Sequence, residues 1–119
     1  MTGLEHATIG LQHAVDAPRR HAAWRWLVRN RMGGVRDALI RELPREDDAW
    51  LAARELTLRR ERDVLLSRLA ALAPLVLETP DIEIVREDLH RLVVDLEHHR
   101  QRLNNLVYDS VSLELGGSE

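Results

Sequence analysis

The most regular pattern of hydrophobic and polar positions in this chain runs from residue 82 to residue 113. Apolar positions recur there at alternating intervals of three and four residues, which is the heptad spacing of a helix that is buried along one face. The row consists of Ile82, Val85, Leu89, Leu92, Leu96, His99, Leu103, Leu106, Ser110 and Leu113. We therefore predict a long helix over residues 81–115, ended by Gly116 and Gly117.

Two further long helices are predicted, over residues 17–43 and 47–73. Pro44 and Pro74 are expected to end them, because proline has no backbone N–H and clashes with the preceding helical turn. The first helix carries an apolar row of Trp24, Val28, Met32, Val35, Leu39 and Leu43. The second carries a leucine at every seventh position, namely Leu51, Leu58, Leu65 and Leu72.

Local signals refine the first of these two helices. Asp16 is expected to cap its N-terminus, with Pro18 in the first turn, where a missing N–H costs nothing. Gly33 and Gly34 lie in its interior, where two glycines cost about 2 kcal/mol relative to alanines. The pair therefore predicts either a bend or the close approach of a neighbouring backbone.

The chain is expected to fold as one all-α domain over residues 1–119. Residues 1–16 form a short helical segment, and short connections make the three long helices antiparallel neighbours in an up-and-down bundle. Residues 74–81 should connect the second and third long helices, with their leucines and valine packed down. The last helix offers more apolar surface than two neighbours cover, so the short segment or a second copy should fill the fourth position. A homodimer is favoured.

Composition narrows the possible functions. The absence of cysteine excludes disulfides, zinc–thiolate sites and thiol catalysis. No apolar run approaches the 18 residues of a membrane span and no signal-peptide core is present, so a cytoplasmic location is expected. All 17 basic residues are arginine, and residues 17–45 carry a charge of +6 within a chain of net charge −3.

One position in the heptad row is polar. His99 interrupts the apolar row, and the matching face of the preceding helix carries Glu55 and Arg62. We predict that these three residues form or border a buried polar layer, because such layers persist where they fix register or the choice of partner. Replacing His99 with leucine should then raise or barely change the melting temperature while blurring the oligomeric state.

The histidines raise the alternative of a metal site. The stretch DLEHHRQRLNNLVYDSV resembles the last helix of hemerythrin-like proteins, whose helices carry a His-His-x-x-Glu pattern, and LRRERDVLLSRLAAL resembles the helix before it. The resemblance implies a di-iron site, for which the candidate ligands are His21, His98 and His99. Arg102 stands where the ligand Glu is expected and Arg62 where a ligand His is expected. Because arginine cannot donate an electron pair to a metal, no cofactor is predicted.

Two surfaces are candidates for interaction. One is the basic flank of the first long helix, with Arg25, Trp26 and Arg29, and the other is the far half of the last helix, with Leu103, Leu106, Val107 and Tyr108. An arginine-rich helix could also bind nucleic acid or an anionic surface, but the negative net charge and the length of the helix argue against DNA reading.

No enzyme is predicted. The serines lack a neighbouring base-and-orienter pattern, and the glycine pair lacks the preceding strand and following lysine of a phosphate loop. The leading hypothesis is a non-enzymatic helical interaction module that self-associates or pairs with another helical protein.

Overall fold

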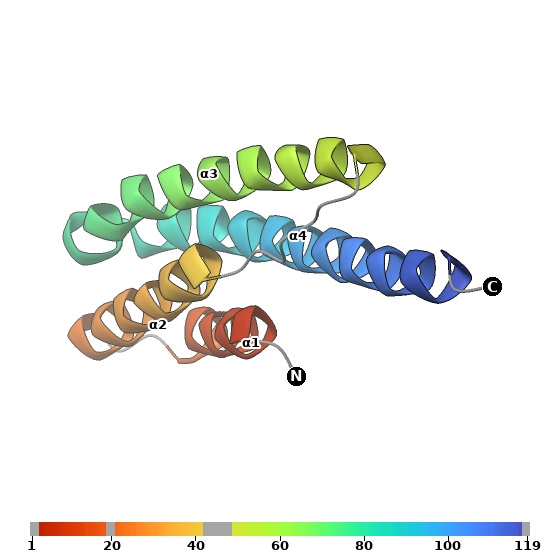
Figure 1. Ribbon diagram of the computed structural model, residues 1–119. Helices are drawn as coiled ribbons and strands as arrows, with labels where there is room; N and C mark the ends of the chain where they lie inside the picture. The colour runs from red at the N-terminus through yellow and green to blue at the C-terminus, as the bar shows by residue number, and fades with distance from the viewer. Residues whose placement is uncertain (1–2, 19–20, 42–48, 118–119) are drawn as a thin grey trace.

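The computed structural model describes residues 3–18, 21–41 and 49–117. They form four helices: α1 (Gly3–Asp16), α2 (His21–Arg41), α3 (Ala49–Glu78) and α4 (Ile82–Gly117). The helices run alternately up and down, and α1 and α3 each pack against both α2 and α4 (Figure 1). The predicted fold is confirmed: three long antiparallel helices with a short N-terminal helix.

The core lies where all four helices run side by side. It is built by the apolar rows expected from the sequence, and its largest fully buried side chains are Leu11, Trp24, Met32, Leu39, Leu89, Leu92 and Leu96. The short helix α1 fills the fourth position of the bundle here, contributing Leu4, Leu11, Ala14 and Val15 to the core. A second copy is therefore not needed to close this part of the bundle.

The turn between α1 and α2 differs from the prediction. Asp16 is the last residue of α1, and α2 begins at His21. The Asp16 carboxylate lies 2.7 Å from Nε2 of His90 on α4, so it ties α1 to α4. The expected N-cap role is therefore wrong, because the tertiary contact with His90 holds this side chain.

The end of α3 also differs. The helix continues through Pro74 to Glu78, so the predicted end at residue 73 is wrong. The exposed proline costs one backbone hydrogen bond, but Val76, two residues further on, is 1% exposed and packs in the core. Thr79 N donates to Leu75 O at 3.0 Å and closes the last turn. Burial of Val76 thus extends the helix beyond the proline.

Helix α4 begins and ends close to the predicted bounds. Asp81 caps its N-terminus, with Oδ1 accepting hydrogen bonds from the backbone N–H groups of Glu83 and Ile84 at 3.1 and 3.4 Å. The helix ends at Gly117, two residues past the predicted end at residue 115. The predicted end of the first long helix at residue 43, before Pro44, and the predicted start of the second at residue 47 lie outside the described residues.

No backbone of the described neighbouring helices packs closely against the two glycines of α2. The helix is continuous from His21 to Arg41, and no heavy atom lies within 4 Å of a Cβ built on Gly33 or Gly34. The expected close approach is therefore wrong. The missing side chains leave open space on the surface of α2.

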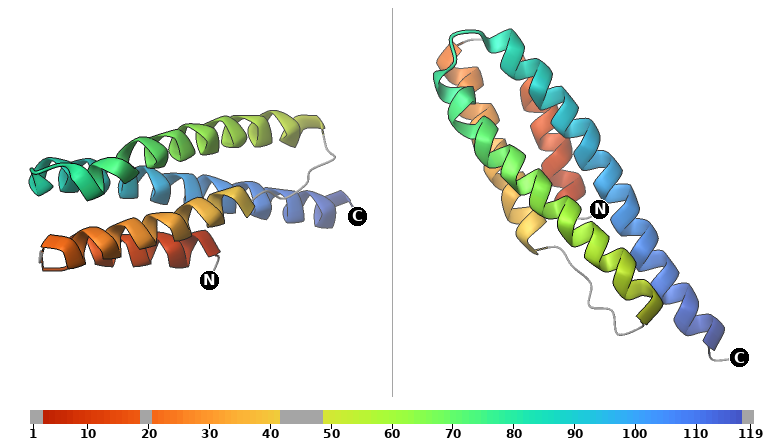
Figure 2. Two further views of the ribbon diagram at one scale, coloured as in Figure 1. Left: turned by 90° about the vertical axis from the view of Figure 1, so that its left-hand side faces the viewer. Right: turned by 90° about the horizontal axis from the view of Figure 1, so that it is seen from above.

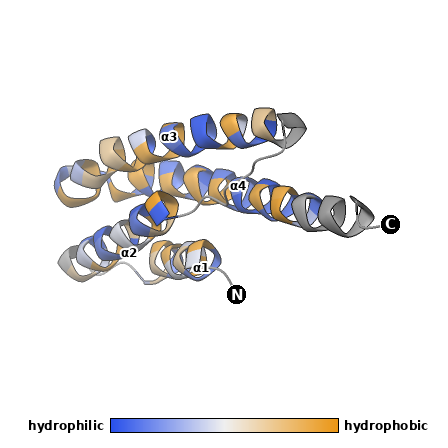
Figure 3. Cartoon of the chain, viewed as in Figure 1, coloured by the Kyte–Doolittle hydropathy of each residue, from blue (hydrophilic) through white to orange (hydrophobic). Residues whose placement is uncertain are grey.

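Beyond the four-helix core, α3 and α4 continue as a two-helix projection (Figures 1 and 2). We call it the arm and define it as residues 49–58 of α3 and 103–117 of α4. Hydrophobic residues recur along α3 and α4 into this region (Figure 3). Its described core is a small cluster of Leu58 and Leu106, with Leu103 packed against it. Every helix in residues 3–18, 21–41 and 49–117 is too short or too polar to cross a bilayer.

Candidate functional site

A buried histidine lies near the junction between the four-helix core and the arm. His99 lies there on α4 and is fully buried, as its place in the heptad row predicts. Its Nδ1 lies 2.6 Å from Oε1 of Glu61 on α3. Because an ionised carboxylate can only accept, Nδ1 carries the hydrogen and donates it to Glu61. The buried imidazole thus has a charged acceptor on the neighbouring helix.

Glu61 also accepts hydrogen bonds from the guanidinium group of Arg102. The Arg102 Nε donates to the Glu61 Oε2 at 3.0 Å, and the second contact, from a terminal nitrogen of Arg102, measures 2.8 Å. One carboxylate therefore binds both a buried ring and a half-exposed cation, and it stays hydrogen-bonded if either partner is removed.

The prediction that His99 is a buried polar residue is confirmed, but the carboxylate that binds it was not among the predicted residues. Glu55 is buried, but it binds Arg59 on its own helix at 2.9 Å. The terminal nitrogen of Arg62 donates to the neighbouring Asp63 at 3.3 Å, and Arg62 Nε is buried without a hydrogen-bond partner among the described residues. Neither Glu55 nor Arg62 is the residue that contacts Nδ1 of His99. That residue is Glu61, one position outside the seam.

A charge pattern in the sequence could have identified Glu61. Three residues of α3 at seven-residue intervals pair across the interface with three residues of α4 at the same interval. The pairs are Arg54–Asp109, Glu61–Arg102 and Arg68–Asp95. The sign alternates along each helix, so sliding one helix by a heptad would oppose like charges. This ladder of ion pairs favours the observed register of α3 on α4.

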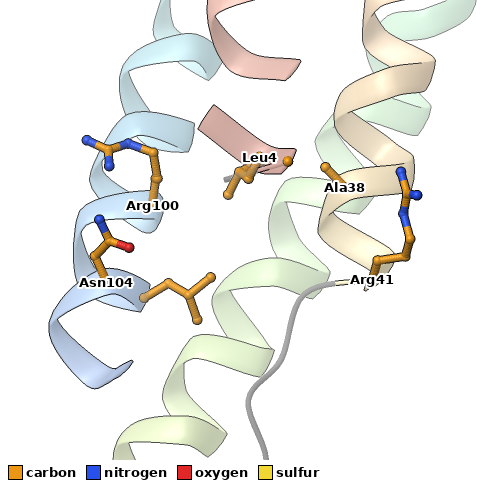
Figure 4. A pocket seen from close by; sticks show the side chains of 7 residues that line it. Leu4, Ala38, Arg41, Arg100 and Asn104 are labelled. Carbon is orange, nitrogen blue, oxygen red and sulfur yellow. The ribbon is translucent and has the colours of Figure 1, made fainter. Parts of the chain in front are cut away.

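A cavity of about 380 Å³ opens beside the junction. Its walls come from the first turn of α1, the end of α2 and the middle of α4, and Figure 4 shows Leu4 between Arg100 and Arg41. The lining residues are Gly3, Leu4, Ala38, Arg41, Arg100, Leu103 and Asn104. Most of this wall is apolar, and its polar groups are two guanidinium groups and one amide.

The charge of Arg100 is matched within its own helix. Its guanidinium contacts Glu97 at 2.6 Å. The hydrogen bond from Arg100 lowers the pKa of Glu97, and the same bond raises the pKa of Arg100. No nucleophile, acid or base lines the cavity among its described residues. The described lining therefore offers apolar surface, two cations and one amide.

The metal-ligand candidates are not brought together in the described part of the chain. His98 is exposed, His99 is bound to Glu61, and the side chain of His21 lies outside the described residues. Among the residues that the structure describes, no group of three or more His, Asp or Glu residues could hold a metal ion.

The two predicted interaction surfaces are smaller than expected. Arg25 donates to the carbonyl oxygens of Val76, at 3.1 Å, and Thr79, so it caps the C-terminus of α3 and is not free to bind a partner. Trp26 is 65% exposed, and Arg29 is exposed too. The first surface keeps these two residues.

On α4, two of the four predicted surface residues are buried or half-buried, and the other two are exposed. Leu106 is buried and Leu103 is half-buried, and both pack in the small cluster with Leu58 of the same chain. The alternating row turns them toward α3. Val107 and Tyr108 are 42% and 72% exposed and remain available to a partner.

Comparison of the chain with protein-family models, with curated proteins and with solved structures finds no match. The two hemerythrin-like segments therefore remain a local resemblance.

Proposed function

We propose that the protein is a non-enzymatic helical interaction module that self-associates through its arm. The observation that carries this proposal is the end of the four-helix core near Leu103, beyond which α4 still continues to Gly117. Two helices alone bury little apolar surface, and the cluster around Leu58 and Leu106 is small. A second pair of helices would complete a four-helix bundle along the arm.

The dimensions fit a second copy. The arm extends from residue 103 to residue 117 of α4, about 21 Å at 1.5 Å per residue. Two arms placed side by side in opposite directions would each occupy the positions that α1 and α2 occupy in the core. Such a pairing buries on the order of 1,000 Å², near the lower limit for a specific interface. We therefore expect a weak, symmetric dimer.

The arms are expected to dock through apolar contacts, because polar groups at their α3–α4 interface already pair within one chain. Arg54 and Asp109 already pair with each other across the arm. Val107 lies one helical turn beyond Leu103 and continues the wall of the junction cavity along α4. Val107 and its neighbour Tyr108 thus supply the exposed apolar contacts that a second copy would cover.

The test compares two identical substitutions on one helix. Val107→Glu places a charge in the proposed interface, whereas Val94→Glu places it on an exposed face of α4 beside the four-helix core, where the valine is 53% exposed. We expect Val107→Glu to weaken dimerisation at least about tenfold, since burying an unpaired carboxylate costs more than about 1.4 kcal/mol. Val94→Glu should leave dimerisation unchanged.

Sedimentation velocity over a dilution series from about 1 to 500 µM measures both effects. A strictly monomeric wild-type chain over the whole series would contradict self-association. Equal weakening by the two variants would contradict the placement of the interface on the arm.

The two alternatives remain predictions with their own measurements. Stoichiometric iron or zinc in the purified protein would support the metal-binding bundle. Affinity for nucleic acid that falls steeply with added salt would support binding through the arginine-rich helix.

A further inference from the structure

A groove on another side of the molecule, between α2 and α3, has no role in the proposed self-association. Its volume is about 650 Å³, and the lining residues that the structure describes all belong to these two helices. Met32 and Leu69 are core residues that reach its floor, and Leu66 and Ala73 lie beside them. Because its described walls come from two neighbouring helices, the groove is open to solvent.

Small residues give this groove its depth. Gly33 on α2 and Ala70 and Ala73 on α3 all line it. Apart from the adjoining backbone of α2 itself, no described heavy atom lies within 4 Å of a Cβ built on Gly33, so the space beside this residue is open. Small residues on two facing helices allow a third helix to approach closely. Exposed apolar side chains, Ile40 and Leu77, extend the apolar surface to the rims.

The α2 rim is positively charged. Arg29 and Arg36 both line the groove, seven residues apart, so they lie on one side of α2 about 10 Å from each other. Arg29 makes no ion pair with any residue in the described ranges, and the one ion pair that Arg36 makes there is an exposed contact with the adjacent Asp37 at 3.2 Å. The lining also holds one acidic residue, Glu78, at the C-terminal end of α3. Two cations on the α2 rim against one carboxylate on the α3 side favour a partner whose acidic groups face α2 and whose apolar groups cover the floor.

We propose that this groove binds an amphipathic helix of another protein, with an apolar face flanked by Asp or Glu. The lining of α2 runs from Arg29 to Ile40, about 16 Å or three helical turns, which suits a short helix whose anchors lie at i, i+3 or i+4, and i+7. A small amphiphile would stay largely exposed in an open groove, because small-ligand sites enclose most of their ligand. A helix brings its own polar outer face. The partner's acidic flank would lie on Arg29 and Arg36.

The experiment uses a labelled synthetic helix of about 14 residues, with leucines at the anchor positions and glutamates on both flanks. A second peptide carries lysine in place of every glutamate. Fluorescence anisotropy at low salt measures their binding to the full chain. We expect the acidic peptide to bind with a Kd of about 50 µM or tighter, and the lysine peptide to bind at least about tenfold more weakly.

Two pairs of variants separate the groove from the rest of the surface. Gly33→Leu fills the groove without changing charge, and Gly34→Leu makes the same change at an exposed neighbour that does not line the groove. Both should keep the fold, since each site has open space and leucine favours helix more than glycine does. We expect Gly33→Leu to weaken acidic-peptide binding roughly tenfold and Gly34→Leu to leave it unchanged.

The second pair of variants reverses a charge. Arg29→Glu is expected to weaken binding of the acidic peptide roughly tenfold. Arg60→Glu is its control, a reversal at an exposed α3 position outside the groove. Equal binding of both peptides, or equal effects within either pair of variants, would overturn the proposal. Loss of self-association in Gly33→Leu would assign the groove to a second copy and overturn it too. Because the arm is untouched by these changes, their outcome is independent of the Val107→Glu test.

Discussion

Replacing Trp24 with alanine is expected to lower the free energy of unfolding by about 4 kcal/mol, the range for deleting a fully buried aromatic side chain. Trp24 is 2% exposed and belongs to the four-helix core. Its indole N–H also donates to the carbonyl oxygen of Val15 at 3.2 Å, the residue before the end of α1. The substitution therefore removes packing and leaves a cavity, and it weakens the attachment of α1.

The loss at α1 should be partial, because a second donor holds the same carbonyl. Arg86 Nε on α4 donates to Val15 O at 3.2 Å, and His90 binds the adjacent Asp16. We expect α1 to remain helical while its amides near Val15 exchange faster with solvent.

Urea unfolding followed by circular dichroism measures the effect, with Trp26→Ala as the matched control. Trp26 lies two residues further along α2 and is 65% exposed, so its removal should change the free energy of unfolding by less than about 0.5 kcal/mol. Similar losses in the two variants would show that burial does not distinguish the two tryptophans.

The contrast between these tryptophans was predictable from spacing alone. Trp24 falls in the apolar row of α2 and Trp26 falls outside it, and the structure buries the first and exposes the second. The same argument placed Leu89, Leu92 and Leu96 in the core. Periodicity is reliable here because a helix projects residues three and four positions apart onto one face, whatever packs against that face.

Where α3 ends was not predictable from local rules. Pro74 is a strong local signal for the end of a helix, yet α3 continues to Glu78. The reasons lie elsewhere in the chain: Val76 is buried in the core, and Arg25 of α2 binds the carbonyl oxygens of Val76 and Thr79. Such a cap joins residues about fifty positions apart, which no local pattern contains.

Of the two residues in this contact, the sequence predicted the buried His99 and did not predict its acceptor Glu61. The heptad row placed His99 inside the bundle, but the choice of its partner depended on the register of α3 against α4. Glu55 and Arg62 share the seam face of α3, whereas the acceptor Glu61 lies at the edge of that face and reaches inward. The alternating charges at seven-residue intervals indicate this register, but only when the sequences of both helices are compared.

The second large effect is expected at this contact, when Glu61 is replaced by leucine. The change leaves the buried His99 ring without its carboxylate acceptor and removes the pairing of Arg102. A buried N–H that loses its acceptor costs the penalty of its lost hydration, so loss of the Nδ1 contact is expected to lower the free energy of unfolding by about 2 kcal/mol. The side chain of Glu61 is 26% exposed, which keeps the loss below that of a fully buried ion pair.

The reverse change should cost far less. In His99→Leu an apolar side chain of similar size enters the core, and Glu61 keeps its hydrogen bonds to Arg102. We expect the free energy of unfolding to change by less than about 1 kcal/mol. The double variant should resemble His99→Leu alone, because the ring whose Nδ1 had lost its acceptor is gone. The cycle of four proteins then yields a coupling of about 2 kcal/mol between the two residues.

Urea unfolding of the four proteins at one pH measures the coupling, and sedimentation velocity on the same samples follows the oligomeric state. If His99 serves specificity, His99→Leu should broaden the distribution of oligomers while stability stays nearly constant. A coupling near zero would mean that the contact between the ring and the carboxylate adds nothing to folding. A large loss of stability in His99→Leu with an unchanged oligomer would assign His99 to the stability of the chain, and the choice of partner would then rest on the apolar arm.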